Sequence, residues 1–331
     1  MKNNISLRKI FFVLILGNLT LSTIIAAESI ATIEPNHLII NDHNANSSLQ
    51  LQSIAQLTNI SIDGIKVSEL SGIVWDDDEN LLYAVSDNGY LLHFRPVFTA
   101  ENLSDILFVA GYPLFDGDDK QLKWKMADSE GITAINNHNG KKKDTEVLIS
   151  FERFPRIIRF STSGKQLAEI ELPGILKNRN DYKSENKMLE SLAFHQEFGL
   201  LTGIEMPLKT RTEHGLYVVS MKNAIWRFNA YDDRDGGLVG MTTTPEGHLL
   251  LVERTYHPFW QRIDTTIHEV TLMPDKGNDS LVARYKLPND TFDENFEGIT
   301  HYKNNYFFMI SDDNNHPFKH TVLVFFKLDR N

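Results

Sequence analysis

The chain has 331 residues, of which 41% are hydrophobic and 23% are charged, so it can form one large globular domain or two small ones. The 44 acidic residues outnumber the 33 basic residues, the formal net charge is -11, and no basic patch stands out, which argues against nucleic acid as a partner. The absence of cysteine excludes disulfides, thiolate metal sites and a cysteine nucleophile.

Residues 1–27 have the layout of a secretory signal peptide. Lys2, Arg8 and Lys9 precede an apolar run at residues 10–16, and Ala26 and Ala27 offer a small-residue cleavage site. The alternative is an uncleaved membrane anchor, although polar residues interrupt the apolar run. We expect cleavage after Ala27, no membrane span in the mature protein, and a periplasmic or secreted location in a bacterium.

Residues 28–48 are polar and without a clear pattern, and we expect a flexible leader there. From residue 49 onward, apolar runs of four to eight residues alternate with turn signals, as at residues 81–85, 147–151 and 306–310. Valine, isoleucine, phenylalanine and tyrosine are common in these runs, and no long amphipathic helix is evident. We therefore assign residues 49–331 to a single all-β domain.

Five of these segments are related to one another. Each has a short strand, a turn, a second apolar strand and then, at its end, an acidic residue. A first repeat position opens the segments, and a second closes them. The first is occupied by Ser71, Glu130, Glu190, Val239 and Glu297, and the second by Asp87, Glu152, Glu205, Glu253 and Asp312. Repeats of several strands, spaced here by roughly 50 to 60 residues, predict a β-propeller of five blades. A sixth blade remains possible if residues 206–238 hide an extra hairpin.

The two ends of the chain are predicted to close the ring. The last repeat has a third strand at residues 320–329 but no fourth strand after it, whereas residues 49–60 resemble the fourth strands and have no repeat of their own. We expect this N-terminal segment to supply the outer strand of the last blade, because closure protects exposed sheet edges. We expect a monomer.

Eight of the ten repeat positions are acidic, and antiparallel pairing places both sets at one face, around the mouth of the channel. Clustered carboxylates need cations nearby. Arg153 and Arg254 directly follow Glu152 and Glu253, and we expect both arginines to serve this mouth. The alternative is that the repeated acids serve packing, or pair with neighbouring arginines and backbone amides.

The repeat blocks also carry a family resemblance. The blocks "DSEGI", "ISFERFPRIIRF", "NKMLESLAF", "LLVER", "NFEGIT" and "MISDDNN" resemble, in this order and spacing, the phytase-like propeller family, described as the esterase-like domain of phytase. The resemblance covers about residues 65–330. It implies a phosphoesterase-type activity carried by the repeated acids. Ser71 and Val239 depart from the acidic pattern, so a site with five identical parts is excluded.

Two classes of function remain open. The first is a metal-assisted hydrolase of a small-molecule phosphoester, with calcium as the expected metal because it accepts many oxygen ligands. The second is a non-catalytic propeller that binds a ligand or a protein. For the first class, the candidate catalytic residues are Glu130, Glu152, Glu190, Glu205, Glu253, Glu297, Arg153 and Arg254. The candidate metal ligands are Asp87, Glu130, Glu190, Glu297 and Asp312. His257 and His316 are further candidates for a base or ligand, or else solvated loop residues.

Overall fold

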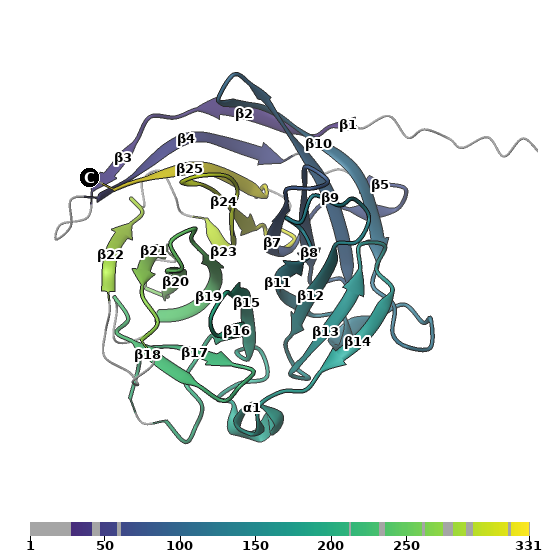
Figure 1. Ribbon diagram of the computed structural model, residues 1–331, viewed down its shortest axis with the longest axis vertical. Helices are drawn as coiled ribbons and strands as arrows, with labels where there is room; N and C mark the ends of the chain where they lie inside the picture. Colours follow the sequence, from purple (N-terminus) through teal and green to yellow (C-terminus); the bar gives the residue numbers. More distant parts are fainter. Residues whose placement is uncertain are drawn as a thin grey trace, which may run out of the picture.

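Five antiparallel sheets surround a common axis in the computed structural model (Figure 1). The structure describes residues 28–41, 47–57, 61–211, 213–231, 236–259, 262–273, 281–288, 294–316 and 319–330. The expected signal peptide lies outside these ranges. No helix within them has the length and apolar character needed to cross a bilayer.

The blades follow one another in chain order, and each runs from an inner strand at the axis to an outer strand. Blade 1 consists of β7 (Leu70–Asp76), β8 (Leu81–Ser86), β9 (Tyr90–Thr99) and β10 (Asn102–Pro113). Blade 2 consists of β11 (Ser129–Ile135), β12 (Glu146–Phe151), β13 (Arg156–Ser161) and β14 (Gln166–Ile170). Blade 3 consists of β15 (Leu189–His195), β16 (Gly199–Ile204), β17 (Leu216–Ser220) and β18 (Ile225–Phe228). Blade 4 consists of β19 (Gly236–Thr243), β20 (Leu249–His257), β21 (Arg262–Val270) and β22 (Leu281–Lys286).

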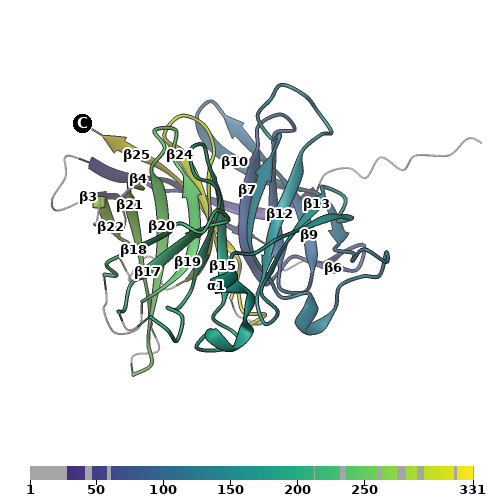
Figure 2. The ribbon, with the colours of Figure 1, turned by 60° about the horizontal axis from the view of Figure 1, so that its bottom comes forward.

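Blade 5 joins the two ends of the chain. It consists of β23 (Asn295–His301), β24 (Tyr306–Asp312), β25 (Val322–Arg330) and β4 (Ser47–Leu57), with β2 (Ala31–Pro35) and β3 (Ile39–Asn41) paired outside β4. β1 (Glu28–Ser29) pairs with β10 of blade 1, and the hairpin of β5 (Ser61–Ile62) and β6 (Ile65–Lys66) leads into β7. Short helices occur at η1 (Trp124–Met126), α1 (Gly174–Lys177) and η2 (Arg179–Asp181). The turned view in Figure 2 shows α1 at the edge of the disc, in the connection between blades 2 and 3.

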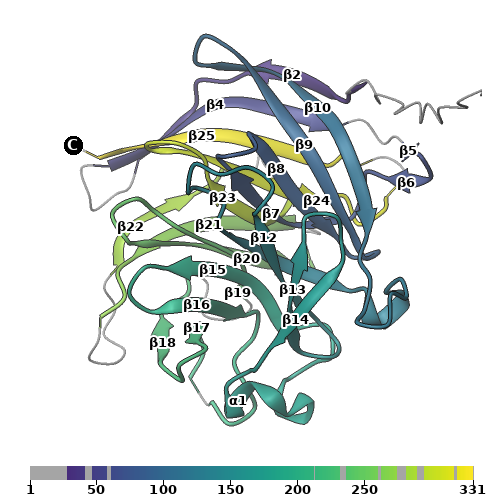
Figure 3. The same ribbon diagram turned by 45° about the vertical axis from the view of Figure 1, so that its right-hand side comes forward.

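These assignments confirm the all-β propeller of five blades and the closure by an N-terminal strand. β4 pairs antiparallel with β25 along the whole length of that strand. Residues 206–238, the candidate for a sixth blade, instead provide the outer strands β17 and β18 of blade 3 and enter β19. Figure 3 shows β4 and β25 side by side next to blade 1.

The segment expected to be a flexible leader is built into the fold. β1 extends blade 1, whereas β2 and β3 extend blade 5, so this stretch bridges the first and last blades. Ile30 is only 1% exposed and belongs to the core between those blades. No local pattern indicated these strands, because they are short and depend on pairing with β4 and β10.

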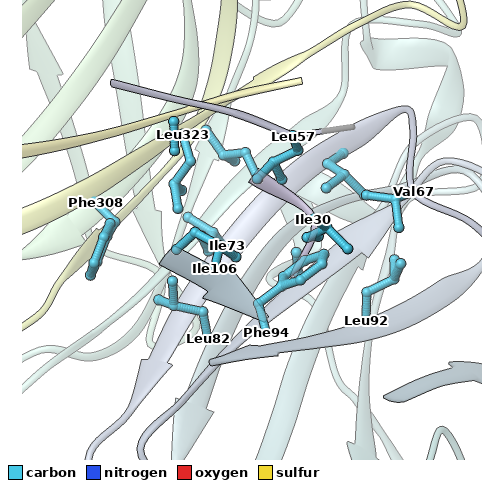
Figure 4. Close-up of a cluster of buried hydrophobic side chains, with 14 of the residues drawn as sticks. Ile30, Leu57, Val67, Ile73, Leu82, Leu92, Phe94, Ile106, Phe308 and Leu323 are labelled. Atoms are coloured by element: carbon cyan, nitrogen blue, oxygen red, sulfur yellow. The ribbon is translucent and has the colours of Figure 1, made fainter. Parts of the chain in front are cut away.

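The hydrophobic core is divided among the interfaces between blades. The described residues form five buried clusters, each between neighbouring blades. Figure 4 shows the one that joins blade 5 to blade 1, where Phe308 and Leu323 face Ile73 and Leu82. Burial of each such side chain contributes roughly 1.5–3 kcal/mol, which allows a chain without disulfides to hold its ring closed.

The inner strands meet in a closed ring at the axis, where β7, β11, β15, β19 and β23 each contact the next. Glycine allows neighbouring inner strands to lie this close together. A Cβ at Gly72 would lie 2.3 Å from the carbonyl oxygen of Glu130, and a Cβ at Gly240 would lie 2.2 Å from that of Glu297. Glycine in a strand commonly marks such close backbone contact.

Truncation should separate the contributions of the N-terminal strands. We expect deletion of residues 28–57 to lower the melting temperature far more than deletion of residues 28–41, because only the longer deletion removes β4 and exposes the edge of β25. Thermal unfolding of the two truncated proteins is the measurement. Equal melting temperatures would show that β4 does not close the ring.

Substitution at the axis should be costly. Gly240→Ala is expected to lower the free energy of unfolding by about 1–3 kcal/mol or more, because the new methyl group meets backbone that cannot move aside. Gly174→Ala is the matched control, since a Cβ there meets nothing within 4 Å. Urea denaturation of both variants tests this, and equal stabilities would contradict the close packing of the inner strands.

Candidate functional site

The first repeat position coincides with a β-bulge in every blade. The pairing of inner and second strands shifts between Leu70 and Gly72, and equivalent shifts occur around Glu130, Glu190, Val239 and Glu297. A bulge turns a side chain out of the regular alternation. The three glutamates at these bulges are therefore buried near the axis instead of projecting from an exposed strand.

One group of carboxylates lies where blades 1 and 2 meet. Single oxygens of Asp87, Asp128 and Glu130 all lie within 4.8 Å of one another. Asp87 directly follows β8, whereas Asp128 and Glu130 flank the start of β11. The hydroxyl of Ser71, the non-acidic first position of blade 1, donates a hydrogen bond to Asp87. We call these three carboxylates the first triad.

Arg153 lies beside the first triad. Its Nε donates to Asp128, and 28% of its side chain remains exposed. Its backbone has a φ of 50°, an uncommon value for a non-glycine residue, and its amide donates to the carbonyl of Glu185 at 3.1 Å. Arg153 therefore stands at the rim of the acidic face.

A second triad lies between blades 2 and 3. Oxygens of Glu152, Glu190 and Glu205 lie within 4.8 Å of one another, and all three residues are buried. The backbone amide of Met188 donates to Glu152 Oε1 at 3.3 Å, and Lys187 Nζ donates to Glu205 Oε1 at 3.0 Å. Glu152 and Glu190 also share a hydrogen bond, which requires a proton on one of them.

Arg254 is a half-buried cation that connects the second triad to blade 5. It donates to Glu205 Oε1 at 2.9 Å, to Asn295 Oδ1 at 2.8 Å and to Glu297. Asn295 in turn donates to Asp312 Oδ2 at 3.4 Å. We define the acidic cluster by its eight carboxylates, namely Asp87, Asp128, Glu130, Glu152, Glu190, Glu205, Glu297 and Asp312.

Glu253 does not join the acidic cluster. It accepts hydrogen bonds from His268 Nε2 at 2.6 Å and from the Tyr231 amide at 2.7 Å, inside blade 4. The second strands of the first three blades end just before their second repeat position, whereas β20 continues to His257. Because side chains alternate along a strand, Glu253 and Arg254 point to opposite sides, and blade 4 presents an arginine where other blades present an acid.

The acidic cluster is not at the mouth of an open channel, contrary to the expectation from the sequence. The inner strands leave a void of about 10 Å³ at the axis, the least that can hold one water. The cluster therefore lies on one face of a closed disc.

His257, the candidate base in blade 4, has its Nε2 3.3 Å from Asp264 Oδ2 on β21.

Burial and mutual repulsion control the protonation of the cluster. Burial, with the neighbouring charges of Asp87 and Glu297, raises the pKa of Glu130 well above its ordinary value. Burial and the charges of Glu152 and Glu205 do the same for the pKa of Glu190. Burial is also the main cause that raises the pKa of both Glu152 and Asp312 to about 7. The cluster is thus short of positive charge at neutral pH.

The donor atoms of both triads fit a hard divalent cation. All are carboxylate oxygens, which suit calcium, magnesium or manganese, and neither triad contains the imidazole that zinc or copper favours. Of the five metal ligands predicted from the sequence, Asp87 and Glu130 fall in the first triad and Glu190 in the second. Glu297 is held by Arg254, and Asp312 lies next to Asn295.

Three polar partners were not predicted, namely Asp128, Lys187 and Asn295. Asp128 and Asn295 each stand two residues before a glutamate–glycine pair, in the sequences "DSEG" and "NFEG". That spacing was the available signal, since side chains two apart on a strand lie on one face. Lys187 precedes β15 and has no counterpart in the repeat, so no spacing pointed to it.

The raised pKa values predict how metal-free protein responds to pH. A carboxyl group whose folded pKa is raised contributes stability that is complete below its unfolded pKa, near 4.5 for Glu152, and lost as pH rises through the folded pKa of about 7. With a chelator present, the free energy of unfolding should therefore fall between pH 5 and 8, by at most about 1.4 kcal/mol per pH unit for each group. Urea denaturation across this range, compared with Glu152→Gln, isolates the contribution of Glu152. If the free energy of unfolding changed with pH by the same amount in both proteins, the raised pKa of Glu152 would be contradicted.

One protein family matches most of the chain. Residues 65–315 match the family described as "Phytase-like: Esterase-like activity of phytase". Among solved structures, a gluconolactonase from Xanthomonas campestris is 12% identical, with a TM-score of 0.42 over 92% of this chain and 98% of that one. A protein of unknown function from Bacteroides caccae is 10% identical, with a TM-score of 0.37 over 83% of this chain and 82% of that one. No curated protein matches the sequence. Since the family match spans most of the chain, this protein belongs to the phytase-like family.

Proposed function

We propose that this protein is a calcium-dependent phosphoester hydrolase whose reaction takes place at the acidic cluster. The observation that carries the proposal is the pair of carboxylate triads on one face of a phytase-like propeller. A propeller that only binds a partner has no need for eight acids, six of them buried, that repel one another. Unit charges about 4 Å apart interact by roughly 4 kcal/mol at an effective dielectric constant near 20, so such a cluster calls for a cation.

The first triad is the better candidate for the metal. Asp87 and Asp128 are partly exposed, so a cation could enter from solvent, and the arginine that contacts this triad, Arg153, lies at the rim with 28% of its side chain exposed. Bound calcium would supply a positive charge that attracts the phosphate and lowers the pKa of a bound water. Arg153, at the rim beside Asp128, would hold a second phosphate oxygen.

The second triad is suited to proton transfer. Glu152 and Glu190 share a hydrogen bond, and burial is the first cause that raises the pKa of both. A general base is most effective when its pKa is close to the working pH, and the pKa of Glu152 is about 7. Glu152 would therefore accept a proton from the attacking water, while Arg254 fixes the positions of Glu205 and Glu297.

The N-terminal sequence indicates where this activity would take place. We propose that residues 1–27 direct export and are removed, and that the mature protein acts as a monomer on a small-molecule phosphoester in the periplasm or outside the cell. Mass spectrometry of the exported protein would test the cleavage after Ala27, and an intact Met1 terminus would contradict it.

Calcium should stabilise the fold. A ligand that binds only the folded protein adds about 2.7 kcal/mol at a hundredfold excess over its Kd, so the melting temperature should rise with calcium and fall with chelator. Asp87→Asn and Glu130→Gln should each reduce this response. Asp77→Asn is the control, because Asp77 lies at the far end of β7, beside Lys303. A melt that is insensitive to chelator, in protein that carries no metal, would refute calcium binding.

Activity should depend on both triads. We expect hydrolysis of phosphomonoesters or phosphodiesters that chelator abolishes and calcium restores. Glu152→Gln should lower kcat about 10²- to 10⁴-fold, the range for loss of a general base, while the calcium-induced rise in melting temperature persists. A protein that binds calcium but hydrolyses no ester in a broad panel would instead be a non-catalytic binding propeller.

A further inference from the structure

A pocket opens beside the first triad. It has a volume of about 870 Å³ and is lined by Asp87 and Asp128 of the acidic cluster, by Arg153, and by residues 121–125 from the connection between blades 1 and 2. A volume of this size accommodates a small organic molecule.

The pocket is the cationic part of an acidic protein. Its lining contains four cations, Lys66, Lys123, Lys125 and Arg153, and three acids, Glu69, Asp87 and Asp128. The chain as a whole has a formal net charge of -11. Lys66 donates to Asn315, and Lys125 lies 3.7 Å from Glu185 in a solvent-exposed pair, which contributes little and leaves the lysine available. The lining thus has one more cation than acids, and its lysines can attract an anion.

Trp124 stands at this pocket with 90% of its surface exposed. The connection that carries it is anchored on both sides. Leu122 is buried and its amide donates to the carbonyl of Leu114 at 2.7 Å, while Ala127 is 1% exposed and packs against Gly89. Trp124 itself has a φ of 58°, a strained value for a bulky residue. Strain held by anchored neighbours is typical of residues that contact ligands.

We infer that residues 123–125, Lys-Trp-Lys, form a substrate clamp in which the indole of Trp124 stacks on a flat ring and the two lysines hold the anionic group. The inference rests on the proposed function and narrows it. The substrate class is a phosphoester whose alcohol part carries a planar aromatic or heteroaromatic ring. Stacking of a base on an aromatic side chain changes affinity by roughly 5- to 150-fold in other proteins that bind single bases.

The test compares two probes that differ in the ring. Adenosine 5′-monophosphate and ribose 5-phosphate share the phosphate and the sugar, and each is titrated by calorimetry at 4 °C, in chelator and in calcium. The intact protein should bind the nucleotide at least about tenfold more tightly. Trp124→Ala should remove this preference, and Trp124→Phe should retain most of it. Lys123→Ala and Lys125→Ala should weaken both probes equally. Phe194→Ala is the control, because Phe194 is 50% exposed in a pocket at the opposite ends of the inner strands, and it should change nothing.

The outcomes separate this inference from the proposed function. Equal affinity for the two probes, a preference that survives Trp124→Ala, or no saturable binding of the nucleotide in either condition would overturn the clamp. A ring preference without hydrolysis of any ester supports the clamp and refutes the hydrolase. Hydrolysis of p-nitrophenyl phosphate with a KM that Trp124→Ala leaves unchanged supports the hydrolase and refutes the clamp.

Discussion

Close approach of the five inner strands at the axis is the constraint on which the acidic cluster depends. Glycine follows the first repeat position in four blades, and at Gly72 and Gly240 the carbonyl oxygen of the neighbouring inner strand occupies the space of a side chain. The bulge just before each glycine turns the first repeat position toward the axis. The ring therefore brings together acids that are about 50 to 60 residues apart in sequence.

Convergence of the acids has an electrostatic cost that the protein itself only partly offsets. Arg254 is half-buried and serves Glu205 and Glu297, whereas Arg153 lies at the rim and serves Asp128. Asp87 and Asp128 of the first triad are partly exposed, whereas all three acids of the second triad are buried. The two triads therefore differ in how open they are to a cation from solvent.

Features that recur in every repeat were predicted from the sequence, whereas features of single blades were missed. Five blades and the closing strand followed from repeats whose apolar runs fix both the strands and their order. Glu253 was misplaced, because the repeat does not show that β20 continues past it. Asp128 and Asn295 were missed because only some blades have a polar residue two positions before the bulge. Strands β1–β3 depend on tertiary pairing, which a local pattern cannot reveal.

The residues that depart from the acidic repeat also make the sides of the cluster differ from one another. Blade 4 contributes Val239 at its first position and Arg254 beside its second, so its side of the cluster is neutralised by the protein. Blade 1 has Ser71, whose hydroxyl holds Asp87 without adding charge. Between blades 1 and 2, the first triad has Arg153 at its rim and adjoins the pocket that the lysines and Trp124 line. In a ring with five identical blades, no side would be distinguished. Because the blades are not identical, one side of the cluster differs from the others, and the pocket that contains Trp124 adjoins that side.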